Sequence, residues 1–138
     1  MYKSYTYEEL QIGQKASLSK TITDEVIRAF ADVSEDRNPL HLDEEFAKDT
    51  IFKERIAHGM ITAGLISAVI GTQLPGLNTI YLKQDLNFTA PVKIGDTITV
   101  EVEVLEKLEK KNVRLSTIAR NQNGDVVVKG EAIVKKPA

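Results

Sequence analysis

The sequence MITAGLISAVIGTQL, residues 60 to 74, decides the fold of this chain. It carries no charge and is hydrophobic nearly all round, within an uncharged run that extends from Gly59 to Leu82. Pro75-Gly76 interrupts that run, so the apolar part is too short to cross a membrane. A helix that is apolar on all sides is normally buried inside a protein. We therefore expect Met60 to about Leu74 to form a buried central helix.

Strand patterns follow this helix. The clearest is a strict alternation of apolar and polar residues, which predicts a strand with one buried and one exposed face; its apolar members are Ile98, Val100, Val102 and Val104. Two further runs cover residues 113–121 and 126–135. Asn123-Gly124 between them predicts a tight hairpin in which both central residues have positive φ. An earlier strand is expected over residues 80–88, ended or placed at an edge by Pro91.

The residues before the central helix predict a short strand over 16–22 and an amphipathic helix that ends near Ser34. Thr23 is positioned to cap that helix, and Asp24 and Glu25 suit its first turn. The whole chain, residues 1–138, then forms one α+β domain in which an antiparallel sheet curls around the central helix. One sheet cannot cover every face of an apolar helix, so we expect a second copy to cover the rest, giving a homodimer.

Composition excludes several classes of function. Of the 138 residues, 18 are Lys or Arg and 20 are Asp or Glu, for a net charge of −2. This balance favours neither nucleic acid nor an anionic membrane as a partner. There is no cysteine, so a disulfide, a thiolate nucleophile and a cysteine-based metal site are all excluded. The first residues lack the apolar run of a signal peptide, and we expect a cytoplasmic protein.

Two short motifs carry the candidate chemistry. The first is Asp36-Arg37-Asn38-Pro39-Leu40-His41, which places a carboxylate and an imidazole five residues apart across an Asn-Pro turn. The second is His58-Gly59-Met60, at the start of the central helix. An acid, an imidazole and a helix that begins with glycine can move protons next to a polarised carbonyl. From spacing alone, turn formation by Asp36 and packing by His41 explain the first motif better than catalysis does.

These motifs, in this order and followed by Leu86-Asn87-Phe88-Thr89-Ala90-Pro91-Val92 with Gly95-Asp96, resemble the R-specific (type 2) enoyl-CoA hydratases, or MaoC-like hydratases. The resemblance extends from about Ile12 to Pro137. It implies a hot-dog fold, in which a curved five-stranded antiparallel sheet wraps a long central helix, and a dimer with its sites near the interface. The length matches the short members that supply R-3-hydroxyacyl-CoA for polyhydroxyalkanoate synthesis.

The resemblance implies roles for particular residues. Asp36 and His41 match the acid–base pair that adds water to a trans-2-enoyl thioester, and the N–H of Gly59 matches the donor that polarises the thioester carbonyl. Which of the pair is base and which is acid stays open at this point. Asn38 is a candidate substrate-binding residue, although shaping the loop explains it better. His58 is better explained by capping or packing than by catalysis.

The resemblance also implies an acyl pocket and a carrier, but no metal and no cofactor. Ser67, Ile70 and Ile133 correspond to positions at the acyl end, while plain core packing remains compatible with the two isoleucines. Bulky walls there favour acyl groups of about four to six carbons. Candidate contacts for the coenzyme A phosphates are the basic residues Arg28, Lys53, Arg55, Lys83, Lys93 and Lys107.

Three alternatives to a hydratase of acyl-CoA stay open. A (3R)-hydroxyacyl-ACP dehydratase would keep the chemistry and use acyl carrier protein as the carrier. A hot-dog thioesterase commonly has a carboxylate on its central helix, but Met60 to Leu74 has none. A non-catalytic acyl-CoA-binding module would not need the Asp36 and His41 pair. The metabolic pathway, whether polyester synthesis, fatty acid synthesis or oxidation, is not indicated by the sequence.

Overall fold

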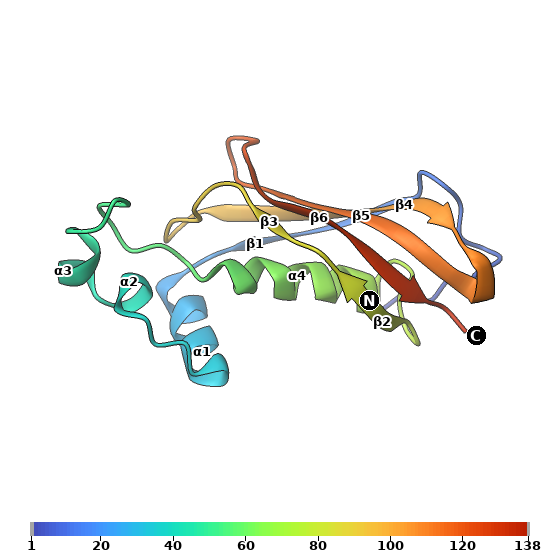
Figure 1. Ribbon diagram of the computed structural model, residues 1–138, viewed down its shortest axis with the longest axis horizontal. Coiled ribbons are helices and arrows are strands. Elements are labelled where there is room, and N and C mark those ends of the chain that lie inside the picture. Colours follow the sequence, from blue (N-terminus) through green and yellow to red (C-terminus); the bar gives the residue numbers. More distant parts are fainter. Residues whose placement is uncertain (1, 138) are drawn as a thin grey trace.

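The central helix α4 (Gly59–Thr72) lies along one face of a twisted antiparallel sheet, as Figure 1 shows. The computed structural model describes residues 2–137. In the described chain the helix starts one residue before the predicted position and ends two residues before the predicted end. Its buried side chains, Ile61, Ile66, Val69 and Ile70 among them, form the core together with the inner face of the sheet. The hot-dog architecture expected from the sequence is confirmed.

The sheet has the strand order β1 (Lys15–Thr21), β4 (Thr97–Lys107), β5 (Asn112–Arg120), β6 (Val126–Lys135) and β2 (Ile80–Gln84), with β3 (Asn87–Phe88) also paired to β6. All of these pairings are antiparallel. The alternation in β4 is confirmed, because its four apolar side chains are fully buried; they are Ile98, Val100, Val102 and Val104.

The expected five-stranded sheet is a sheet of six strands, because the strand predicted over residues 80–88 is split into β2 and β3. Both halves pair with β6, so they occupy a single edge position. Between them, the main chain of Asp85 comes so close to Gly130 that a Cβ there would lie 2.0 Å from the Asp85 carbonyl oxygen. Asp85 also donates its N–H to Glu131 and accepts from the Glu131 N–H through its side chain. These contacts interrupt the edge strand.

The turn between β5 and β6 differs from the prediction. Gly124 has a φ of 85°, but Asn123 does not have the positive φ that a two-residue turn of this kind requires. Instead Asn121 organises a longer loop: its carbonyl accepts from the Gly124 N–H, and its side chain accepts from the N–H groups of Asn123 and Asp125. The side chain of Asn121 thus replaces the backbone conformation that we expected of Asn123.

Three helices lie beyond one end of the sheet, at the left of Figure 1. They are α1 (Asp24–Ser34), α2 (Pro39–Leu42) and α3 (Glu44–Ala47). The predicted cap of α1 is confirmed by the bond from the Val26 N–H to Thr23 Oγ1, at 3.2 Å. A short 3-10 turn, η1 (Glu109–Lys111), connects β4 to β5. No helix within residues 2–137 is long and apolar enough to cross a lipid bilayer.

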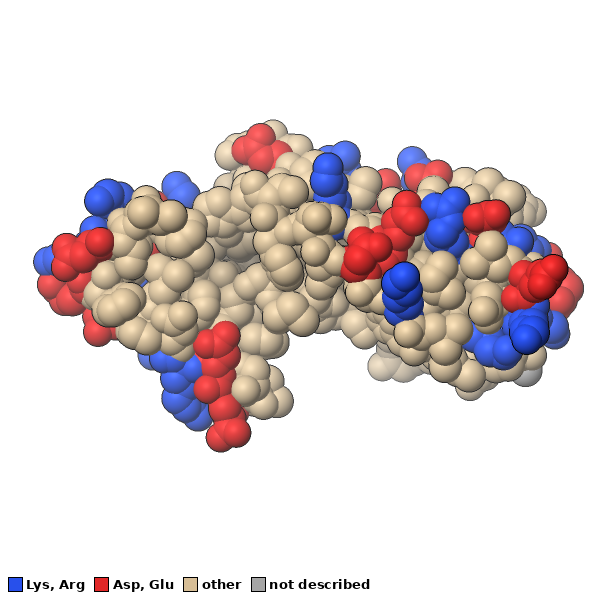
Figure 2. Space-filling view, viewed as in Figure 1, with Lys and Arg blue, Asp and Glu red and all other residues tan. Residues whose placement is uncertain are grey.

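One face of α4 stays open in the single chain. Met60 is 54% exposed, and Gly64 and Ser67 on the same side are also exposed. Figure 2 shows a largely uncharged area left of the middle of the molecule, with charged side chains at the left end, at the lower left and across the right half. Two exposed apolar side chains beside the helix add to the open surface: Tyr81, which lines a hollow with Met60 and Ser67, and Phe88, which faces Gly59.

Candidate active site

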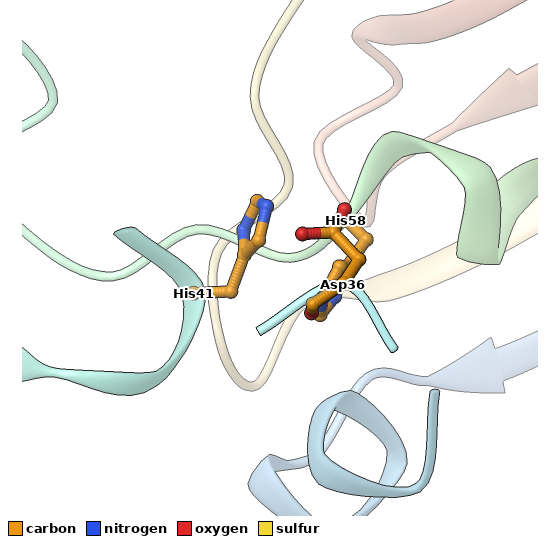
Figure 3. Close-up of side chains that lie close together, drawn as sticks. All are labelled: Asp36, His41 and His58. Carbon is orange, nitrogen blue, oxygen red and sulfur yellow. The ribbon is translucent and has the colours of Figure 1, made fainter. Parts of the chain in front are cut away.

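Asp36, His41 and His58 converge at the N-terminal end of α4 (Figure 3). They come from three different segments: the loop after α1, the short helix α2, and the residue before α4. One ligand-type atom of each lies within 4.8 Å of the others. The structure therefore brings together the carboxylate and imidazole that the sequence placed in one motif, and adds the second histidine.

The loop geometry follows from its sequence. Helix α1 ends at Glu35, which adopts a left-handed conformation with a φ of 64°. Ser34 Oγ then accepts from the Asp36 N–H at 3.1 Å, and Asp36 Oδ1 accepts from the Asn38 N–H at 3.3 Å. Asn38 caps α2 by accepting from the Leu40 N–H, and Pro39 occupies the first position of that helix, where its missing N–H is not needed.

His41 is anchored on two sides. Its ring Nδ1 lies 2.8 Å from the Ile56 carbonyl oxygen, and its own carbonyl oxygen accepts from Arg55 Nε at 2.7 Å. Because a carbonyl oxygen only accepts, Nδ1 carries the proton in this bond. The lone pair of the neutral ring is then on Nε2. Only 9% of His41 is exposed.

Burial lowers the pKa of His41 below its ordinary value of 6.5. The hydrogen bond to the Ile56 carbonyl opposes this shift, the neighbouring His58 adds to it, and the Asp36 carboxylate opposes it. The net direction favours the neutral ring, which is the form that can accept a proton.

Gly59 is the first residue of α4, so its N–H is one of the helix donors that have no acceptor inside the helix. It faces the ring of Phe88: a Cβ at position 59 would lie 2.6 Å from Phe88 Cε1. A side chain at position 59 would therefore displace the Phe88 ring. Gly59 and His41 line the same cavity of about 340 Å³. The other lining residues are mostly apolar: Phe52, Ile56, Ala57, Phe88, Thr89, Ala90, Pro91, Val92 and Val128.

The residues expected at the acyl end do not join this cavity. Ser67 lines a separate hollow of about 420 Å³ on the open face of α4, beside Phe30, Met60 and Tyr81. Ile70 is 1% exposed and belongs to the core. Ile133 is half-buried and alternates with the buried Ala132 and Val134, which places it on the other face of the sheet. Within one chain the structure therefore does not bring Ile133 together with Ser67 and Ile70, and the role of these three residues in substrate binding stays a prediction.

His58 and Arg55 have contacts that the sequence did not predict. His58 precedes α4 but makes no side-chain capping bond; it lies 3% exposed between Phe30 and His41 and bonds to the Asp36 carbonyl. Arg55, one of the candidate phosphate contacts, instead pairs with Asp24 and has only 10% of its side chain exposed. His58 belongs to the second motif, and packing was expected for it, but its two partners were not; for Arg55 the only signal was its proximity in sequence to that motif.

The cluster of Asp36, His41 and His58 has the residue types of a metal site, but its geometry does not favour one. Each histidine has one ring nitrogen that makes no bond to a carbonyl oxygen, Nε2 of His41 and Nδ1 of His58. The two rings stack with an interplanar angle of 30°, so the lone pairs on these nitrogens lie in two offset planes. A bound ion needs lone pairs that converge on it.

The chain is similar to known proteins over nearly its whole length. Residues 8–125 match the model of the MaoC-like domain. An (R)-specific enoyl-CoA hydratase of Rhodospirillum rubrum is 51% identical, over 96% of this chain and 92% of that protein. One of Aeromonas caviae is 49% identical, over 94% of this chain and 98% of the relative. The unliganded R-hydratase of Pseudomonas aeruginosa superposes with a TM-score of 0.93 at 54% identity, covering 97% of this chain and 86% of that one.

Proposed function

The chain belongs to the MaoC-like family and is an (R)-specific enoyl-CoA hydratase, and we propose that Asp36 and His41 carry out its chemistry on a single water molecule. The reaction adds water across the double bond of a trans-2-enoyl-CoA and gives (R)-3-hydroxyacyl-CoA. The observation that carries the residue assignment is the convergence of the Asp36 carboxylate and the His41 ring beside the cavity that Gly59 lines.

We assign the base to His41. Its Nδ1 proton is held by the Ile56 carbonyl, so the free lone pair is on Nε2, and its lowered pKa keeps that lone pair available near neutral pH. In the proposed reaction Nε2 takes a proton from water while the water oxygen bonds to C3. The same proton then passes from Nε2 to C2, which completes the addition on one face of the alkene.

Asp36 has a supporting role in this scheme. Its carboxylate orients the water and stabilises the imidazolium that forms when His41 is protonated, as the opposing effect of Asp36 on the His41 pKa indicates. The N–H of Gly59, at the positive end of the α4 dipole, donates a hydrogen bond to the thioester carbonyl oxygen and stabilises the negative charge that develops there. Asn38 holds the loop through its capping bond rather than touching substrate.

The acyl tail is proposed to run from Gly59 along the open face of α4 toward Ser67, with Ile70 beneath it. The hollow beside Ser67 is open to solvent in one chain, and a second copy placed on this face would close it. The cavity beside His41 then accepts the thioester and the start of its carrier arm. This arrangement gives the homodimer a direct part in substrate binding. A cytoplasmic location is proposed to accompany the coenzyme A thioester substrate.

The test is to offer crotonyl-CoA to the purified protein, follow loss of enoyl-thioester absorbance, and resolve the configuration of the 3-hydroxybutyryl product. Formation of the R product supports the assignment. The same acyl group on acyl carrier protein, offered at equal concentration, distinguishes the carriers. A kcat/KM higher for the carrier-protein thioester would make the chain a (3R)-hydroxyacyl-ACP dehydratase, while release of free coenzyme A without hydration would indicate a thioesterase.

A further inference from the structure

The ring of His58 lies in the middle of the site without lining the cavity. It is 3% exposed and stacks on His41 with a centroid separation of 3.9 Å. On its other side it packs against Phe30 at 4.9 Å, with the rings tilted by 57°. The scheme above, in which Asp36 and His41 act on water, does not use this side chain.

The hydrogen bonding of His58 defines where its proton is. Nε2 lies 2.8 Å from the carbonyl oxygen of Asp36, and a carbonyl oxygen can only accept, so Nε2 is the protonated nitrogen. Nδ1 is buried and has no hydrogen-bond partner among the described residues. A proton on Nδ1 would bury an N–H without an acceptor, which is costly. The ring is thus held as the Nε2–H tautomer.

This single ring therefore contacts both members of the acid–base pair. Its edge fixes the main chain of Asp36, and its face fixes the ring plane of His41. The two residues come from separate segments, the loop after α1 and helix α2, and each is bound to the start of α4 through His58. A displacement of about 1 Å in such a pair is enough to lower a rate by about 100-fold.

We propose that His58 is a positioning residue, which sets the geometry of Asp36 and His41 through its Nε2–H bond and its stacked face. The proposal rests on the proposed function, because it assumes that these two residues carry out the chemistry. It assigns His58 no contact with substrate.

Two variants separate the two contacts. His58→Phe keeps a ring that can stack on His41 but removes the donor to Asp36. His58→Gln keeps a donor but removes the stacked ring. Thr117→Val is the control, because it removes a buried side-chain donor to a main-chain carbonyl, that of Gly130, at 3.0 Å. It also removes the acceptor that Thr117 Oγ1 offers to Gln84 Nε2 at 2.9 Å, and it leaves Asp36, His41 and His58 untouched.

For His58→Phe we expect kcat to fall by about tenfold to 100-fold while KM changes little, since substrate contacts remain. For His58→Gln we expect a smaller fall in kcat and a shift of the acid limb of the kcat/KM profile to higher pH. The reason is that water then reaches His41, whose other charged neighbours, Asp36 and the Arg55–Asp24 pair, are unchanged. A merely structural role would lower the unfolding temperature, as in Thr117→Val, and leave the pH profile in place.

Nitrogen NMR of the wild-type protein labelled in histidine tests the tautomer without any variant. The expected spectrum gives His58 a protonated Nε2 and an unprotonated Nδ1. A proton on Nδ1, or kcat and pH profiles for both variants that match those of Thr117→Val, would overturn the proposal. If one variant does not fold, the other and the spectrum decide. Failure of the proposed function is distinguished by Asp36→Asn, which would then keep wild-type activity whatever the His58 variants do.

Discussion

The guanidinium of Arg55 donates from Nε to the carbonyl oxygen of His41 across 2.7 Å, and the same side chain pairs with Asp24 in the first turn of α1. His41 is thus tied to α1 through its main chain, in addition to the bond that its ring makes with Ile56. The position of the proposed base depends on an arginine that has only 10% of its side chain exposed.

Removing this arginine should affect stability and activity together. Arg55→Ala leaves the His41 carbonyl without its side-chain donor and leaves the Asp24 carboxylate with Arg28 alone, and we expect a loss of about 1–3 kcal/mol in the free energy of unfolding. Arg28→Ala is the control, since Arg28 binds Asp24 in an exposed pair and does not reach His41. Denaturant titration and kcat measure the two effects. Equal losses in both variants would contradict a specific role for the bond to His41.

The acid–base pair should be essential to the rate and dispensable for folding. For Asp36→Asn and His41→Gln we expect hydration of crotonyl-CoA to fall by at least about 100-fold, the usual contribution of acid–base groups. Asp32→Asn, a nearby exposed carboxylate paired with Arg37, is the control and should keep wild-type activity. Circular dichroism checks that each variant is folded. A rate above about a tenth of wild type in either variant of the pair would remove that residue from the mechanism.

Position 59 offers a test in which activity and stability should change in opposite directions. Gly59→Ala is favourable for a helix, by up to about 1 kcal/mol, but its Cβ would lie 2.6 Å from the Phe88 ring. Phe88 is 54% exposed, so the ring can move, and it would move within the cavity that both residues line. We expect a thermal midpoint that is unchanged or raised, together with a lower kcat/KM.

The double variant Gly59→Ala/Phe88→Ala distinguishes the cause. If displacement of the ring lowers activity, the second substitution restores part of the loss. If the Cβ itself blocks the thioester carbonyl, Gly59→Ala lowers kcat/KM by the same factor in the Phe88→Ala background as in the wild-type background. A Gly59→Ala enzyme with wild-type kcat/KM would contradict the close approach of substrate to this helix end.

The lowered pKa of His41 makes a prediction about pH. The proposed base works when neutral, so kcat/KM should fall on acidification with a midpoint below the ordinary 6.5 of histidine. The same shift affects stability: the unfolded chain binds this proton more readily, so the contribution is present above pH 6.5 and is lost as the pH falls toward the folded pKa. Unfolding free energies at several pH values, for wild type and His41→Gln, measure the difference, which should shrink in acid.

The open face of α4 should be the surface between two copies. Ser67→Asp introduces a charge there, next to Met60 and Gly64, and burying an unpaired charge is costly. We expect light scattering to give about twice the chain mass of 15.3 kDa for wild type, and a shift toward the single-chain mass for the variant. Asn123→Asp, in the exposed loop between β5 and β6, is the charge-matched control. A wild type of single-chain mass at micromolar concentration would contradict the homodimer.

The sequence predicted what depends on local pattern. The uncharged run predicted α4, the strict alternation predicted β4, and Thr23 predicted the start of α1. Each of these features is determined by residues that are neighbours in the sequence. The split of the edge strand was missed because it depends on Gly130, which lies far along the chain from Asp85. The hairpin was misjudged because Asn121 supplies bonds that the dipeptide alone does not reveal.

One sequence motif predicted the Asp36 and His41 pair of the site. The contacts that hold this pair in place could not be predicted from the sequence. Arg55 and His58 act on main-chain carbonyls, and such bonds carry no sequence pattern because every residue has a carbonyl. The face of the sheet on which Ile133 lies was not available from the sequence, because a shift of one residue along a strand moves a side chain to the other face. Resemblance to a family locates a position, while the direction of its side chain depends on register.

The segment from α1 to α3 lies at one end of the sheet and carries Asp36 and His41. Its Ile27 belongs to the buried core cluster, and Val26, Phe30 and Leu42 pack against that cluster. The exposed polar residues of this segment can therefore be exchanged while these apolar contacts keep it attached to the sheet and α4. Such an arrangement leaves room for evolution toward new thioester chemistries.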